Sequence, residues 1–404
     1  MRRLLSYLGA SLVLVAPALG AAGARPGNSE VQAALGAEVG RAALVDPQVQ
    51  AALRALAPGE TMNVIVKLRD QAGLKTITGR DRAARIKAVI QALQAKADSS
   101  QRDLRVLLEV RRRQGAVKDY VPLWITNSFA VTATGNVIRE LAARPEVLSI
   151  TLDATIQEPT LAAPSLADPT PPEANLALIN APALWQLGFH GQGVVVASMD
   201  TGVDANHPDL AAQWRGGNNS WFDPNGQHPS TPTDVSGHGT WTMGVIVARD
   251  TGGTDIGVAP DARWIAAKIF DDRGSATVSR IHQGFQWLLD PDGDPTTPDA
   301  PNVVNNSWGF QDSGCNLEFQ LDVQALRAAG IATVFAAGNS GPSAASDLSP
   351  ANYPESLAVG ATDNVDTLYP YSSRGPSACG ETQTTYPDLV APGVSVRTTD
   401  LYGA

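Results

Sequence analysis

The sequence predicts an α/β fold in which a doubly wound parallel sheet, at residues 176–404, follows a small α+β segment at residues 25–157. Runs of apolar and β-branched residues recur along the second half of the chain, and segments with helical spacing separate them. In the first half, apolar and polar residues alternate over short stretches, as in half-buried strands. Residues 158–175 are rich in proline and lack periodicity, so we expect a linker there.

The beginning of the chain has the composition of a secretory signal. Arg2 and Arg3 precede an apolar stretch at Leu4–Leu19, and small residues continue to Ala24. A retained membrane anchor is the alternative, but the stretch is short for a spanning helix, and polar residues and a proline interrupt it. We therefore expect residues 1–24 to be removed as a signal peptide, which predicts a secreted, extracellular protein without a membrane anchor.

In the α+β segment, the expected order of elements is strand, helix, strand, helix, strand. The elements are a strand at 61–70, a long helix at 81–113, an extended segment at 120–134, a short helix at 136–143 and a strand at 146–153. Within the long helix, Ser100 and Asp103 are spaced to cap a second helical segment.

In the second part, buried apolar strands alternate with helices. Strands are expected at 193–199, 263–270, 302–308, 331–338 and 355–362, and helices at 278–289 and 317–329. Ligand chemistry in a doubly wound sheet lies at the carboxyl ends of the strands. Asp200, the Ser307–Gly309 stretch and Asn339 all follow such strand ends, so we expect them at one edge of the sheet.

Two of these residues have the properties of a proton-transfer pair. Asp200 directly follows an apolar run, where a carboxylate can hold an imidazole in one tautomer and stabilise its charged form. Taken alone, Asp-Thr-Gly also opens aspartic protease sites, and an aspartate at a strand end is often only a helix cap. His238 opens a helical pattern between Gly237 and Gly239, which leaves its ring accessible as a general base.

A third candidate site residue is Asn339, which follows Gly338 in a turn after an apolar strand. Its carboxamide is placed to donate to a developing oxyanion, although a turn residue with positive φ is the other interpretation. The chain has no HExxH motif and no paired-cysteine spacing, so a zinc site is not expected and no cofactor is expected to be required. Calcium is left open, because no ligand cluster in the sequence is specific enough to nominate.

Charge and cysteine content limit the partners. Residues 25–157 hold 19 Lys and Arg against 13 Asp and Glu, whereas residues 158–404 hold 9 against 27. Opposite charges predict that the two parts attract one another, although two independently solvated surfaces would show the same composition. An acidic main domain argues against nucleic acid as a partner.

Cys315 and Cys379 form one disulfide or stay unpaired, and the sequence does not decide between these two states.

Eight ordered motifs between residues 182 and 404 resemble those of the subtilisin family of serine peptidases. They are MDTGVDANHPDL, SGHGTWTMG, IGVAPDARWIAAKIFD, VVNNSWG, FAAGNSG, NYPESLAVGAT, YSSRGP and LVAPGVSV. The stretch KIFDDRGSATVSRIHQGFQWLLDP is similar to the bacillopeptidase F type of secreted endopeptidase. The resemblance implies that Asp200 is the triad aspartate, His238 the general base and Asn339 the oxyanion donor.

The same resemblance implies a subtilisin-like fold and a substrate-binding role for Ser307, Trp308 and Gly309, together with Gly338. It also implies protein or peptide substrates. Residues 25–157 resemble an inhibitory and chaperone-like prosegment of the ferredoxin-like type, which binds the peptidase domain of its own chain.

Two features depart from the family pattern. Trp241 stands where relatives usually have a second, non-catalytic histidine. No Gly-Thr-Ser follows LVAPGVSVRTTDLYGA, so we expect a chain truncated before its catalytic serine and inactive as it stands. Two alternatives remain open, a non-catalytic protein that binds peptides by β-strand addition and a prosegment that inhibits proteases in trans.

Overall fold

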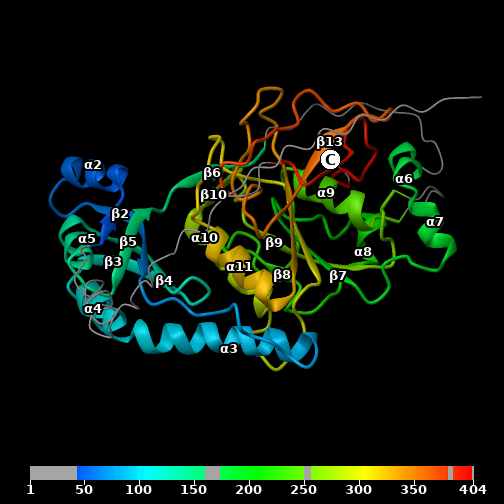
Figure 1. Ribbon diagram of the computed structural model, residues 1–404. Coiled ribbons are helices and arrows are strands. Elements are labelled where there is room, and N and C mark those ends of the chain that lie inside the picture. Colours follow the sequence, from blue (N-terminus) through cyan, green and yellow to red (C-terminus); the bar gives the residue numbers. More distant parts are fainter. Residues whose placement is uncertain (1–42, 160–172, 250–255, 381–384, 403–404) are drawn as a thin grey trace, which may run out of the picture. The chain divides into compact units, whose positions relative to one another are not determined.

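The computed structural model describes residues 43–159, 173–249, 256–380 and 385–402. Ala42–Ala404 form one compact unit (Figure 1). We call residues 43–159 the first region and residues 173–402 the second region. The expected signal peptide and most of the expected linker lie outside the described residues. Within the described part of the chain, no helix combines the length and the apolar character needed to cross a bilayer.

A seven-stranded sheet forms the centre of the second region, in the order β14-β13-β12-β11-β7-β9-β8. Its strands are β7 (Val195–Asp200), β8 (Trp221–Phe222), β9 (Arg263–Lys268), β11 (Val303–Asn306), β12 (Ala332–Ala336), β13 (Leu357–Thr362) and β14 (Leu389–Pro392). All strand pairs in this sheet are parallel. The chain adds β9 and β8 on one side of β7 and β11 to β14 on the other, which confirms the doubly wound sheet and puts its switch point beside β7.

Helices cover this sheet. They are α6 (Ala174–Leu178), α7 (Ala181–Gln186), α8 (Pro208–Ala211), α9 (His238–Val247), α10 (Val278–Leu289) and α11 (Gln320–Ala329). The α10 bounds match the prediction. The α11 helix begins three residues later than predicted, because Asn316 Oδ1 first accepts the backbone N–H of Glu318 in a local turn.

The first region holds a five-stranded sheet in the order β1-β5-β2-β4-β3. Its elements are β1 (Leu44–Val45), α2 (Pro47–Ala55), β2 (Thr61–Leu68), α3 (Arg82–Ser100), α4 (Arg102–Arg113), β3 (Val117–Leu123), β4 (Ser128–Thr134), α5 (Gly135–Ala142), β5 (Val147–Leu152) and the separate strand β6 (Thr155–Gln157). From β2 to β5 the chain follows the β-α-β-β-α-β order of a ferredoxin-like fold.

Details of the predicted first region are wrong. Residues 120–134 belong to the β3–β4 hairpin rather than to one extended element, and Asn127 turns between the strands with a φ of 44°. Ser100 and Asp103 do not cap a second helix, because the N-cap of α4 is Gln101, which makes no side-chain cap bond. The buried amide of Gln101 instead donates to Asn127 Oδ1 at 3.0 Å. This tertiary hydrogen bond lies where α3 ends and α4 begins, and no local sequence pattern predicts it. The short elements β1, α2 and β6 were not predicted.

Hydrogen bonds join the first region to the helices of the second. The backbone N–H groups of Trp124 and Ile125 donate to Gln286 Oε1 at 2.7 and 3.3 Å. At the start of α10, Asp153 accepts the backbone N–H of Ser279 at 2.8 Å and its hydroxyl at 2.7 Å. In Figure 1, α11 lies beside α3. The contacts therefore centre on α10 and α11.

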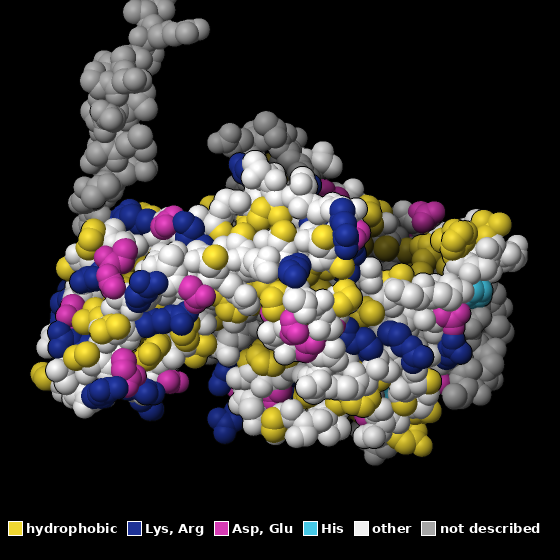
Figure 2. Space-filling model, turned by 90° about the horizontal axis from the view of Figure 1, so that it is seen from below, with side chains coloured by type: hydrophobic (Ala, Val, Ile, Leu, Met, Phe, Trp, Pro, Cys, Tyr) yellow, Lys and Arg dark blue, Asp and Glu magenta, His cyan; other side chains and the backbone are white. Residues whose placement is uncertain are grey.

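Basic side chains contribute to the same contact. Lys67 Nζ lies 3.3 Å from Glu318 Oε1 in an ion pair that links the two regions. Arg82 donates to the main-chain carbonyl of Pro301, which precedes β11. Arg85 donates to the main-chain carbonyl of Ala328, at the end of α11. Other basic groups stay at the surface, and Figure 2 shows Lys and Arg side chains on the left, the side where Figure 1 places α4. Lys67 and Glu318 thus bring opposite charges of the two regions together.

Cys315 and Cys379 form a disulfide, which answers the question that the sequence left open. The bond joins the loop that precedes α11 to the segment that precedes β14. No free cysteine is found among the described residues.

Candidate active site

Asp200 and His238 meet at the carboxyl end of the central strand. Asp200 is the last residue of β7 and is 1% exposed, and His238 is the first residue of α9. Oδ1 of Asp200 lies 2.7 Å from His238 Nδ1 and also accepts the backbone N–H of Thr201 at 2.7 Å. Because an ionised carboxylate only accepts hydrogen bonds, Nδ1 donates, and Nε2 is the ring nitrogen left to exchange a proton.

The turn before α9 fixes the imidazole ring in place. Asp234 accepts the backbone N–H groups of Gly237 and Thr240 at 3.0 and 2.9 Å. Gly237 has a φ of 98°, which favours glycine. Thr201 Oγ1 accepts the backbone N–H of Gly239 at 2.9 Å, so the residue after Asp200 holds the residue after His238. The aspartate and the histidine are therefore coupled through both side chains and backbone.

Electrostatics favour a charged imidazole. Burial lowers the pKa of His238, but the charge and hydrogen bond of Asp200 outweigh burial, and the charges of Asp234 and Glu158 act in the same direction. The net effect raises the pKa of His238 above its ordinary value. A ring with this pKa accepts a proton more readily, as a general base must.

Asn339 follows β12 in the turn that contains Gly338. Gly338 has a φ of 105°, and a Cβ there would lie 2.5 Å from the Leu348 side chain and 2.9 Å from Ser373 Oγ. Only glycine fits this turn, whose carbonyl accepts the Ser373 backbone N–H at 2.9 Å. The side chain of Asn339 is exposed, and no hydrogen bond to its carboxamide is found in the described part of the chain. Its amide donors are thus available to a ligand.

The stretch after β11 has two different roles in the structure. Trp308 is 3% exposed, and its ring packs edge-on against Phe319 and Phe335. Its side chain is therefore part of the core, and this stretch can meet a peptide mainly through its backbone. Ser307 Oγ accepts a hydrogen bond from Asn305 Nδ2 at 3.0 Å, a contact within the same stretch.

One cavity of about 800 Å³ brings the predicted residues together. It is lined by His238, Ser307, Trp308, Gly309, Gly338 and Asn339, and Asp200 lies directly behind the His238 ring. Gln157, Glu158 and Pro159 also line this cavity, so the end of the first region enters it. The β6 strand reaches it by pairing antiparallel with β10 (Ser275–Thr277), and the Glu158 backbone N–H continues the ladder to Gly274 at 2.8 Å.

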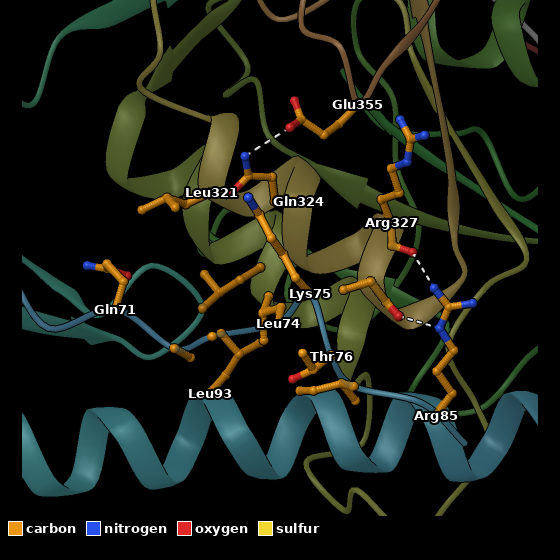
Figure 3. A pocket seen from close by; sticks show the side chains of 15 residues that line it. Gln71, Leu74, Lys75, Thr76, Arg85, Leu93, Leu321, Gln324, Arg327 and Glu355 are labelled. Atoms are coloured by element: carbon orange, nitrogen blue, oxygen red, sulfur yellow. Dashed lines mark hydrogen bonds between the residues drawn. The ribbon is translucent and has the colours of Figure 1, made fainter. Parts of the chain in front are cut away.

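A second cavity, of about 510 Å³, lies between the chain that joins β2 to α3 and the helix α11 (Figure 3). Its lining includes Leu74, Arg85 and Glu355 but none of the residues near His238. Figure 3 shows Gln324 donating to Glu355, and Arg85 reaching two main-chain carbonyls at the end of α11. This cavity belongs to the contact between the regions and has no catalytic groups comparable to the first.

Sequence reasoning missed two positioning residues. Asp234 lies four residues before His238, and its pattern with Gly237 is the kind of turn signal that could have identified it. Lys268 is completely buried at the end of β9, opposite Asp200, and its Nζ donates to the Thr201 carbonyl at 2.8 Å. A lysine at the end of an apolar strand was the available signal, since an unpaired buried charge is costly.

Comparison with known proteins agrees with this geometry. Residues 191–403 match the profile of the subtilase family. The chain is 36% identical to bacillopeptidase F of Bacillus subtilis (strain 168) over 338 residues, which cover 77% of this chain and 23% of that protein. It is 32% identical to subtilisin amylosacchariticus of Bacillus subtilis subsp. amylosacchariticus over 283 residues, or 69% of this chain and 65% of that one. It is 34% identical to a subtilisin of Bacillus pumilus over 234 residues, which cover 57% of this chain and 76% of that protein.

The chain thus spans 23% of the length of bacillopeptidase F and 65% of that of subtilisin amylosacchariticus. The profile match extends over more than half of the chain and contains β7, α9 and the turn after β12. The parallel sheet and the Asp200–His238 pair lie inside it. The chain belongs to the subtilase family.

Proposed function

We propose that the second region belongs to a secreted serine endopeptidase that hydrolyses peptide bonds in proteins or peptides. A serine hydroxyl attacks the peptide carbonyl while His238 Nε2 takes its proton. Asp200 stabilises the imidazolium that forms, and the Asn339 carboxamide donates to the oxyanion. His238 then gives the proton to the leaving amine, and water releases the acyl group by the same route. Neither a metal ion nor a cofactor takes part in these steps.

The observation that carries this proposal is the 2.7 Å contact between Asp200 and His238 at the mouth of a cavity that also holds Asn339. In the proposed enzyme the nucleophile is a serine outside the 404 residues, so this chain by itself is expected to be inactive. The hydrogen bonds found for the His238 ring within the described residues go to Asp200 alone, which leaves Nε2 for that serine.

The test is to read the coding DNA through the codon for Ala404, express the reading frame found, and assay hydrolysis of a peptide amide. His238→Ala should lower kcat by about a millionfold, the size measured for a subtilisin triad histidine. His190→Ala, outside the cavity, is the matched control and should retain activity. Full activity of the His238 variant would overturn the assignment, and a stop codon directly after Ala404 would favour a peptide-binding protein.

A second proposed function concerns residues 25–157, which we infer to be a prosegment that blocks the cavity and helps the second region to fold. The entry of Gln157–Pro159 into the cavity supports this role. The experiment is to add residues 25–157 to a subtilisin of Bacillus and measure peptide hydrolysis. Inhibition at micromolar concentration is expected. Unchanged hydrolysis at that concentration, from a segment that circular dichroism shows to be folded, would contradict the inhibitory role.

A further inference from the structure

The carboxyl group of Glu158 lies at the cavity of His238. Glu158 lines this cavity, and its backbone N–H donates to the Gly274 carbonyl at 2.8 Å, which holds the residue in place. Gly274 has a φ of 74°, and a Cβ there would lie 2.8 Å from Glu158 Cδ and 2.9 Å from Glu158 Oε1. The Glu158 side chain therefore packs directly against the backbone of Gly274, in space that a larger residue would fill.

One oxygen of this carboxyl group has no partner. Glu158 Oε2 is buried, and no hydrogen bond to it is found among the described residues. Arg273 precedes Gly274 but is exposed, and no ion pair joins it to Glu158 in the described part of the chain. A buried oxygen without a donor is costly when the carboxyl group is ionised and much less so when it is protonated.

The charged groups around Glu158 come from three elements. Asp200 at the end of β7 and Asp234 in the turn before α9 are negative, and His238 at the start of α9 is the positive neighbour when protonated. Burial has the largest effect and raises the pKa of Glu158. Ser236 and the charge of His238 lower this pKa, the charges of Asp200 and Asp234 raise it, and the net result lies above its ordinary value of 4.5.

We propose that the occupancy of the cavity by Gln157–Pro159 depends on pH through the carboxyl group of Glu158, so that the segment withdraws more often once this group is ionised. An ionised Glu158 regains water when the segment withdraws, whereas a protonated one gains little. The occupancy is therefore highest below pH 4.5 and declines as the pH rises through the raised pKa of Glu158. This inference rests on the contact of Glu158 in the cavity and not on the proposed peptidase activity.

Hydrogen exchange at the Glu158 amide reports this occupancy, because the amide is protected while it donates to Gly274. The full chain is exchanged at pH 4.5 and at pH 8, and mass spectrometry follows the peptide that spans residues 155–159, with rates corrected for the intrinsic effect of pH. A peptide from β4 serves as the internal reference for changes in overall stability. Protection relative to this reference should fall severalfold at pH 8. Equal relative protection at the two pH values would overturn the proposal.

The variant Glu158→Gln keeps the size of the side chain and cannot ionise, so its relative protection should be the same at both pH values. Glu60→Gln, at an exposed position outside the cavity, is the matched control and should keep the pH dependence of the wild type. If Glu158→Gln lost protection at pH 8 as the wild type does, the pH dependence would belong to another group and the proposal would be wrong.

Two further variants distinguish Glu158 from His238, which also titrates at this contact. His238→Gln removes the neighbouring positive charge, and Ser236→Ala removes a group that favours the ionised carboxyl, so each variant should raise the pKa of Glu158. The decline in protection should then extend to higher pH than in the wild type. A His238→Gln variant whose protection no longer changes with pH would identify the imidazole as the titrating group and contradict the proposal.

Discussion

The Oδ1 atom of Asp200 sets the proton position on His238. It accepts hydrogen bonds from the His238 ring and from the Thr201 backbone, while Oδ2 is buried without a partner among the described residues. The buried Lys268 donates to the carbonyl of Thr201, so a positive charge lies close to the strand end that carries the carboxylate. An Asp200 carboxylate that accepts a hydrogen bond from Nδ1 holds the imidazole in the tautomer that leaves Nε2 free.

Asn339 gives a prediction for an active form of the proposed endopeptidase. Replacing it with alanine should lower kcat by about a hundred- to a thousandfold, the loss measured when a subtilisin loses its oxyanion amide, with little change in KM. The reason is that an oxyanion donor acts on the transition state and not on the bound substrate. Asn219→Ala, outside the cavity, serves as control for steady-state kinetics. A rise in KM at constant kcat would show that Asn339 binds substrate and does not stabilise the oxyanion.

The α10 helix begins without a cap of its own. Thr277 occupies the N-cap position without a side-chain cap bond, and Asp153 from the first region instead accepts the backbone N–H and the hydroxyl of Ser279. A helix that obtains its cap from a distant segment is less stable without that segment. The first region thereby stabilises one of the two helices on which it lies.

Asp153→Ala should therefore weaken the start of α10 by about 1 kcal/mol. Hydrogen exchange of the Ser279 amide should accelerate about fivefold, the rate change that corresponds to that free energy. Asp153→Asn should retain most of the protection, since asparagine caps helices as well as aspartate does. Equal exchange rates in the alanine variant and the wild type would show that the cap contributes nothing.

The disulfide gives a second prediction for the segments it joins. Cys315 and Cys379 are 64 residues apart, and closing a loop of this length stabilises the folded state by about 4 kcal/mol in the chain-entropy account. Replacing both cysteines with serine should lower the free energy of unfolding by that amount. Urea unfolding of the wild type with and without a reductant provides the check. Identical midpoints in the two conditions would contradict a stabilising disulfide.

A chain of buried charges extends across both regions. His282 in α10 is completely buried, with Nδ1 2.9 Å from Asp322 Oδ2 and Nε2 3.4 Å from Glu318 Oε1, and Glu318 in turn pairs with Lys67. Burial lowers the pKa of His282, but the two carboxylates outweigh burial and raise the pKa to about 9. Burial likewise raises the pKa of Glu318, yet its cationic partners lower it to about 2.

The raised pKa of His282 predicts that stability depends on pH. The protonated ring stabilises the fold fully below its unfolded pKa of 6.5, and this contribution is lost as the pH rises through about 9. A difference of this size corresponds to about 3 kcal/mol. Urea unfolding at pH 6 and pH 9.5 should show the loss in the wild type. His282→Gln, whose amide does not titrate, should show a smaller loss, and an equal loss in that variant would refute the role of His282.

Local sequence patterns predicted the elements whose signals are local. The apolar spacing at 278–289 gave α10 with its observed bounds, and the run ending at Asp200 gave β7. The contact of Asp200 with His238 could be expected from the resemblance and from the rule for doubly wound sheets. The β3–β4 turn, the pairing of Cys315 with Cys379 and the entry of Glu158 into the cavity depend on distant contacts, which no local pattern contains.

The entry of Gln157–Pro159 into the cavity of His238 has a consequence for competition. As long as this segment is covalently attached, it faces the cavity at an effective concentration on the order of millimolar, whatever the concentration of the protein. Under the proposed prosegment role, dilution does not displace this segment, and a peptide from solution must outcompete it. One cut between the two regions turns the segment into an ordinary ligand. The fraction of cavities that it occupies then falls with every dilution.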